Sequence, residues 1–149
     1  MIFERETRIR APIKEVFAFF SDPKNLARIT PPAMKFKIVN APERPLREGD
    51  RIDYQIRIMG VPLRWKTLIT EWDEGRAFAD YQEKGPYRHW LHRHTFTEAG
   101  SEVVMHDRVD YELPFGVVGR LFGGAFVRRQ IQSIFDYREG AIGSFLARK

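Results

Sequence analysis

The stretch GPYRHWLHRHTFTEAGSEVVMHDRVDYELPFG, residues 85–116, indicates a β-hairpin with an unusual face. Successive side chains of a strand point to opposite faces, so Trp90, His92, His94 and Phe96 lie on the same side of the first strand. The face is largely apolar, yet it carries an imidazole, His92, opposed to a carboxylate, Asp107. This combination is typical of a cavity wall rather than of an ordinary core.

We place the turn of this hairpin at Ala99–Gly100, because a glycine suits a tight turn. The face that carries the histidines then includes Val103, Met105, Asp107, Val109 and Tyr111 of the second strand. This register sets His92 opposite Asp107, Trp90 opposite Val109 and His94 opposite Met105. A slip of one residue would exchange the faces of one strand.

The rest of the chain predicts strands and helices around this hairpin. Residues 2–10 form a strand, Ala11–Pro12 starts a short helix, and a second helical piece ends at Thr30. Alternating apolar residues then predict further strands, with turns at 59–62 and 73–75. Helical spacing of apolar residues marks a long final helix from 117 to about 146. The prediction is one α+β domain, 1–149, in which a curved antiparallel sheet of about seven strands wraps around the last helix.

Composition excludes several classes of protein. Cysteine is absent, which excludes disulfides and thiolate chemistry. The net charge of +5 is scattered along the chain, whereas nucleic-acid-binding proteins concentrate positive charge on one face, so we expect no nucleic-acid partner. No run of about 18 apolar residues predicts a membrane span, and we expect at most weak contact with a membrane surface. The charged N-terminus lacks a signal sequence, which predicts a cytoplasmic protein.

Four motifs carry a resemblance to a known group of proteins. They are ITPP at 29–32, GPYRxWxHxHxF at 85–96, DxVxY at 107–111 and PFG at 114–116. With the order of elements, they resemble the SRPBCC superfamily, which includes START domains, the birch-pollen allergen and polyketide cyclase/dehydrase-like proteins. The similarity covers the whole chain and is greatest to a bacterial single-domain branch. It implies a helix-grip fold with an apolar cavity between the sheet and the C-terminal helix.

His92 and Asp107 are the candidate catalytic residues. A carboxylate beside an imidazole fixes its tautomer and raises its basicity, as a general base requires. The alternative is that each group satisfies the hydrogen bonds of the other in a buried wall. Both interpretations remain open from the sequence.

His94 forms a His-x-His pair with His92, and Asp107 could add a third ligand to a zinc ion. No further histidine lies on that face, and we predict neither a metal nor another cofactor. The sequence also lacks the glycine-rich motifs that hold nucleotide phosphates.

Inward-facing polar and aromatic side chains of several strands, with two phenylalanines of the final helix, are the candidate ligand-binding set. Asp80 and Gln82 would orient a ligand or lock the sheet by a salt bridge, and Trp72 is expected to face outward at an edge. The full set comprises Tyr54, Trp65, Thr67, Phe78, Asp80, Gln82, Trp90, His92, His94, Phe96, Met105, Asp107, Tyr111, Phe122 and Phe126.

These observations favour a non-catalytic protein that binds a small hydrophobic or amphipathic molecule, lipid-like or aromatic and polyketide-like. A cyclase, dehydratase or hydrolase using His92 and Asp107 is the first alternative. A module that binds or regulates another protein is the second. Fold alone does not choose among them.

Overall fold

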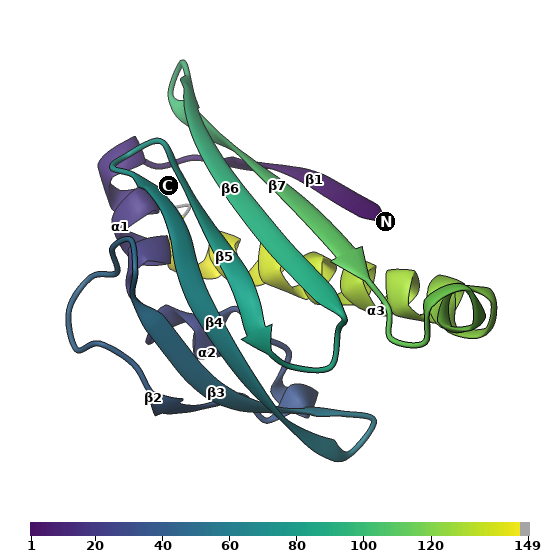
Figure 1. Ribbon diagram of the computed structural model, residues 1–149. Coiled ribbons are helices and arrows are strands. Elements are labelled where there is room, and N and C mark those ends of the chain that lie inside the picture. Colours follow the sequence, from purple (N-terminus) through teal and green to yellow (C-terminus); the bar gives the residue numbers. More distant parts are fainter. Residues whose placement is uncertain (147–149) are drawn as a thin grey trace.

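The computed structural model describes residues 1–146 and shows a seven-stranded antiparallel sheet with one long helix (Figure 1). The strands are ordered β1-β7-β6-β5-β4-β3-β2 across the sheet. This confirms the α+β class and the predicted order of elements; the end of the predicted domain, 147–149, lies outside the described residues. The elements are β1 (Ile2–Ile9), α1 (Ile13–Ser21), α2 (Asn25–Arg28), the short 3-10 helix η1 (Pro32–Met34), β2 (Lys37–Asn40), β3 (Arg51–Ile58), β4 (Val61–Asp73), β5 (Ala77–Lys84), β6 (His89–Ala99), β7 (Glu102–Glu112) and α3 (Gly116–Phe145).

Helix α3 lies across one face of the curved sheet and ends beside α1 (Figure 1). Its buried side chains, Ile131, Phe135 and Ile142, pack against strand residues of the inner face. Phe17 of α1 completes the core at that end through edge-on contacts with other aromatic rings. The inner face of the sheet is therefore covered by α3 and α1. Within residues 1–146, no helix combines the length and the hydropathy needed to cross a membrane.

The β6–β7 hairpin differs from the predicted register by two residues. Its turn is Gly100–Ser101, and His94, not His92, lies directly opposite Asp107. The reason is the backbone: Gly100 has φ +65°, which the first residue of a tight hairpin turn requires and which an alanine at that position would resist. The shift is even, so the predicted inward faces of both strands are unchanged. The pairs are Trp90 with Tyr111, His92 with Val109, His94 with Asp107 and Phe96 with Met105.

Gly100→Ala should destabilise the protein by about 1 kcal/mol, because a Cβ at positive φ is strained. The added methyl group would meet no atom within 4 Å, so the loss would report backbone strain alone. Gly140→Ala in α3 is the control, since open space surrounds that position too. It should raise stability by up to about 1 kcal/mol. Urea denaturation measures both changes, and equal effects of the two variants would contradict this account of the turn.

Trp72 faces the core rather than the solvent, contrary to the prediction. Its ring centroid lies 5.3 Å from that of Phe17 and 5.2 Å from that of Phe78. The pairing of β4 with β5 shifts between Ile69 and Glu71. Such a bulge reverses the alternation beyond it, and simple period-two counting therefore fails for Trp72.

Candidate functional site

Four ionisable side chains meet on the inner face of three neighbouring strands. Asp80 comes from β5, His92 and His94 from β6, and Asp107 from β7. The strand pairing sets Asp80 opposite His92 and His94 opposite Asp107. We call these four residues the His–Asp quartet. Alternation within each strand brings them to the same face, and the sheet pairing brings them into contact.

The shortest contacts within the His–Asp quartet are diagonal. His92 Nε2 lies 2.7 Å from Asp107 Oδ1, and His94 Nε2 lies 2.8 Å from Asp80 Oδ2. The two imidazoles stack between the carboxylates with ring centroids 3.8 Å apart. The remaining ring nitrogens lie farther from a carboxylate: His94 Nδ1 is 3.2 Å from Asp107 Oδ1, and His92 Nδ1 is 3.9 Å from Asp80 Oδ2. Each carboxylate thus faces both rings.

Both carboxyl groups of the quartet are held in the ionised form. Burial alone would raise the pKa of Asp107 and of Asp80, but hydrogen bonds from the imidazoles and their charge outweigh burial and lower both. An ionised carboxylate can only accept hydrogen bonds. The ring nitrogens that contact the carboxylates at 2.7 and 2.8 Å must therefore donate. This places the N–H of neutral His92 at Nε2 and leaves its Nδ1 as an acceptor.

The pKa values of the two histidines shift in opposite directions. Burial, and then the charge of His94, lower the pKa of His92 below its ordinary value, against the opposing influence of the carboxylates. For His94, burial is outweighed by its contacts with Asp107 and Asp80, and the pKa is raised. Asp107 does raise the pKa of His92, as expected, but burial and the charge of His94 outweigh that effect. His94 is therefore the histidine of the quartet that binds a proton more readily.

Arg138 of α3 supplies a second positive charge, and the sequence prediction did not include it. Its guanidinium lies over the ring of Phe135 at 5.1 Å, and its buried Nε has no hydrogen-bond partner. Burial lowers the pKa of Arg138, while the charges of Asp107 and Asp80 oppose that shift. Together with a proton on His94, Arg138 would balance the two carboxylates of the quartet. The signal in the sequence was an arginine that continues the buried spacing of Ile131 and Phe135.

Two adjacent compartments of a cavity lie beside the quartet, with volumes of about 100 and 90 Å³. Six residues line both: Leu26, Tyr54, Trp65, Trp90, His92 and Arg138. The first compartment also reaches Asp80 and His94, and the second reaches Ile131 and Phe135 under α3. Trp65 is 6% exposed, and its buried indole Nε1 has no hydrogen-bond partner. The wall of the cavity is therefore mostly apolar, with aromatic and aliphatic side chains, and it also carries charged groups and an unpartnered donor.

Eight of the predicted ligand-binding residues line this cavity: Tyr54, Trp65, Thr67, Phe78, Asp80, Trp90, His92 and His94. Phe96, Met105 and Tyr111 instead lie in the packed core, and Asp107 lies behind the histidines with 1% exposure. Sequence reasoning missed Arg138 together with Leu26, Ile29, Met34 and Phe36, which come from α3, α2, η1 and their flanking segments.

Three other members of the predicted set lie outside the cavity. The amide of Gln82 is bonded to the backbone of Tyr87, donating to its carbonyl at 2.7 Å and accepting from its N–H at 3.2 Å. It therefore closes the loop between β5 and β6. Phe122 and Phe126 were expected to face inward from α3, but they are 86% and 51% exposed. The start of α3 extends beyond the end of β7, where no strand covers it (Figure 1).

Within residues 1–146, Asp80, His92 and His94 form a group that could offer ligands to a metal ion, with ligand atoms within 4.8 Å of one another. The geometry of these side chains suits hydrogen bonding within the quartet better than it suits binding of a metal ion. The short contacts to carboxylates already use one nitrogen of each ring.

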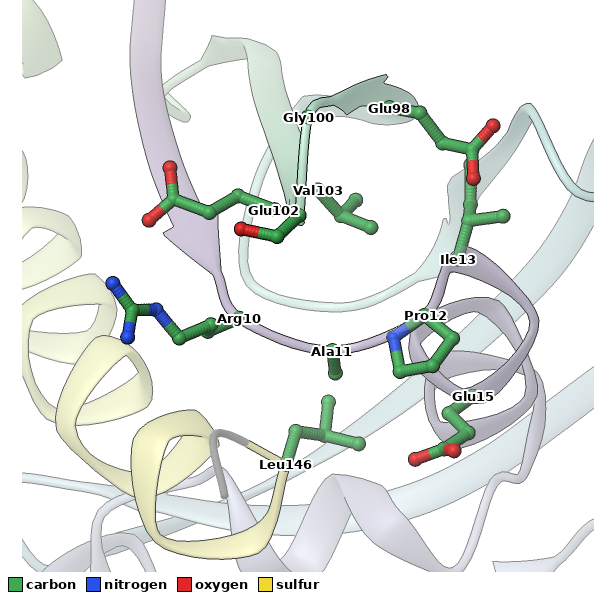
Figure 2. Close-up of a pocket in the computed structure, with 11 residues that line it drawn as sticks. Arg10, Ala11, Pro12, Ile13, Glu15, Glu98, Gly100, Glu102, Val103 and Leu146 are labelled. Atoms are coloured by element: carbon green, nitrogen blue, oxygen red, sulfur yellow. The ribbon is translucent and has the colours of Figure 1, made fainter. Parts of the chain in front are cut away.

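A separate hollow on the surface lies between the β1–α1 connection, the β6–β7 turn and Leu146 (Figure 2). Figure 2 shows the charged ends of Arg10, Glu15, Glu98 and Glu102 around its rim. No member of the His–Asp quartet lines it. The hollow is open to solvent and brings together no buried polar group, so the candidate site is the cavity under α3.

A curved antiparallel sheet folded over a long C-terminal helix, with a cavity between them, defines a protein of the START-like, helix-grip class. The chain belongs to the polyketide cyclase / dehydrase and lipid transport family, whose family model matches residues 1–141. This confirms the resemblance that the sequence motifs indicated. Comparison with curated proteins gives no match.

Solved structures of the same fold cover nearly the whole chain. TTHA0849 from Thermus thermophilus has a TM-score of 0.73 and 19% identity, covering 97% of this chain and 98% of its own. A START superfamily protein from Mycobacterium smegmatis has a TM-score of 0.74 and 14% identity, with coverage of 97% and 96%. CV1439 from Chromobacterium violaceum has a TM-score of 0.77 and 12% identity, with coverage of 99% and 98%. At these identities the similarity shows the fold.

Proposed function

We propose that the protein binds one small, mostly apolar molecule that carries an acceptor oxygen, in the cavity between the sheet and α3. The observation that carries the proposal is the buried, unpartnered indole N–H of Trp65, which lines both compartments beside Arg138. A buried donor without a partner costs about 1–3 kcal/mol. A ligand oxygen would remove that cost on binding.

The walls of the cavity suit an aromatic or short acyl group. Tyr54 stacks on Trp65 with centroids 5.9 Å apart, and Trp90 meets Trp65 edge-on at 5.3 Å. Cavities of about 150 Å³ accept benzene in other proteins. Each compartment is smaller than that, so a ring-sized ligand would span both. Burial of its apolar surface contributes roughly 25 cal/mol per Å² before ordering costs.

Polar groups in the wall of the cavity would orient the ligand. Trp65 Nε1 and Arg138 Nε are buried donors without partners, whereas His92 bonds to Asp107 and His94 bonds to Asp80. A ligand oxygen therefore pairs best with Trp65 and Arg138. This fits a carbonyl, phenol or carboxylate group on an aromatic or lipid-like body.

Trp65→Phe should weaken binding of acetophenone about fivefold, which corresponds to one lost hydrogen bond. Ethylbenzene has a similar shape but no acceptor, and its affinity should change less than about twofold. Isothermal titration calorimetry with the two probes measures the contrast.

Trp72→Phe is the matched control, because the indole N–H of Trp72 donates to Glu74 at 2.9 Å outside the cavity. It should leave both affinities unchanged. If acetophenone bound no better than ethylbenzene to the unaltered protein, or if neither bound, the proposal would be wrong.

An enzyme is the second candidate, supported by the fixed tautomer of His92. Its N–H is directed to Asp107, and its Nδ1 acceptor remains at a wall of the cavity. A neutral imidazole in this setting could accept a proton from a bound cyclase, dehydratase or hydrolase substrate. Mass spectrometry of the bound probe over time separates the two functions, since a binding protein returns the probe with its mass unchanged.

A further inference from the structure

The first turns of α3 expose an unusually large apolar surface. Phe122 and Phe115 are 86% and 83% exposed, and Leu121 is 75% exposed. We call this surface the α3 apolar patch; it comprises Phe115, Val117, Val118, Leu121, Phe122 and Phe126. Contiguous exposed apolar surfaces of this kind mark sites of interaction.

The α3 apolar patch lies on one side of the helix. Val117 and Leu121, and likewise Val118 and Phe122, are four residues apart and therefore adjacent on the helix surface. The opposite side of these turns approaches the rest of the protein: Gly119 packs near Pro114, and Gly124 near Met1. Apart from Arg120, this part of the helix carries no charged residue before Arg128. It therefore lacks the polar outer face that a solvent-exposed helix normally carries.

All charged residues between 113 and 135, the segment that carries the α3 apolar patch, are arginines. Arg120, Arg128 and Arg129 are exposed, and no aspartate or glutamate occurs between Glu112 and Asp136. Arg128 donates to the carbonyl of Ile2 at 3.1 Å, which positions it at the side of the helix. A partner must therefore offer both an apolar interior and negative charge at its surface.

A second copy of this chain does not meet that requirement. In a two-fold dimer the same patch faces itself, so the arginines of one copy would meet those of the other without a carboxylate from this segment. An anionic lipid bilayer does meet it, because its acyl region accepts the apolar side chains and its phosphates attract the arginines. We propose that the protein docks on anionic membranes through the α3 apolar patch, with the start of α3 lying in the plane of the interface.

Co-sedimentation with lipid vesicles tests this proposal. The protein should bind vesicles of phosphatidylcholine mixed with phosphatidylglycerol and bind phosphatidylcholine alone much more weakly. Phe122→Ser should lower the partition coefficient about tenfold, because it removes apolar surface inserted into the bilayer. Arg129→Glu should lower it about tenfold or more, because it reverses one charge at an anionic surface.

Two control variants distinguish docking from general attraction of a basic protein. Met59→Ser removes an apolar side chain that is 78% exposed at the β3–β4 turn, and Lys37→Glu reverses one exposed charge on β2. Both should retain the binding of the unaltered protein. Absence of binding to the mixed vesicles, or equal losses in the controls, would overturn the proposal. A dimer in solution that Phe122→Ser dissociates would also overturn it and would assign the patch to a second copy.

Discussion

Asp107→Asn should lower the free energy of unfolding by about 3 kcal/mol or more, the largest single effect expected in this protein. Asp107 is 1% exposed, and its Oδ1 lies 2.7 Å from His92 Nε2 and 3.2 Å from His94 Nδ1. The substitution keeps the shape of the side chain but removes its charge. Protonated His94 and Arg138 would then face Asp80 as the one remaining carboxylate of the quartet. Removing one partner of a buried ion pair leaves an uncompensated charge, which is costly in a medium of low dielectric constant.

Asp53→Asn is the matched control for this experiment. Asp53 also pairs with a cation, Arg64 at 2.9 Å, but the guanidinium side chain is 59% exposed. Solvent screens such pairs, so the loss should be much smaller. Urea denaturation followed by circular dichroism measures both variants. A loss for Asp107→Asn no greater than that for Asp53→Asn would show that the quartet does not stabilise the fold electrostatically.

The stability lost on His92→Gln and the stability lost on His94→Gln should depend on pH in opposite directions. The pKa of His94 is raised in the folded protein, so the folded state binds its proton more tightly than the unfolded state. The stabilisation from His94 is therefore fully present below the unfolded value of about 6.5 and is lost as pH rises through the raised folded pKa. His94→Gln should consequently cost more stability in mildly acidic than in alkaline solution.

His92 follows the opposite rule, because burial and the charge of His94 lower its pKa. In the unfolded protein His92 takes up a proton near a pH of about 6.5, whereas in the folded protein it does not. The contribution of His92 to stability therefore decreases as the pH falls below that value. His92→Gln should therefore cost less in mildly acidic than in alkaline solution. Each unit of pKa shift corresponds to about 1.4 kcal/mol. Denaturation midpoints across the neutral range measure the two slopes, and slopes of the same sign would contradict the assignment of the proton to His94.

Much of the fold follows from local patterns in the chain. Alternation in β6 and β7 places His92, His94 and Asp107 on the inner face, and it does so even though the predicted register was two residues away from the observed one. An even shift cannot change a face, because the side-chain period of a strand is two. The helical spacing at the end of the chain likewise predicts α3, and buried Ile131 lies on the expected side.

The candidate site was only partly predictable, because local patterns indicate the direction of a side chain along its own element but not how separate elements pack. The histidines and Asp80 belong to strands, where alternation indicates direction. The position of Arg138 depends on where α3 rests on the sheet, and an arginine in a helix ordinarily indicates a solvent-exposed position. Phe122 and Phe126 show the converse: apolar spacing suggests burial, yet α3 extends beyond the strands that would cover them.

By itself, the sequence determined the class of fold, the inward faces of the strands and the presence of imidazoles and carboxylates in a cavity wall. These properties depend on local periodicity, which each segment expresses independently of its neighbours. The tertiary structure alone decided which histidine contacts which aspartate, that His94 binds a proton more readily than His92, and that Arg138 lies in the field of both carboxylates. Those outcomes depend on distances of a few ångströms between separate elements, and on burial that only the assembled fold creates.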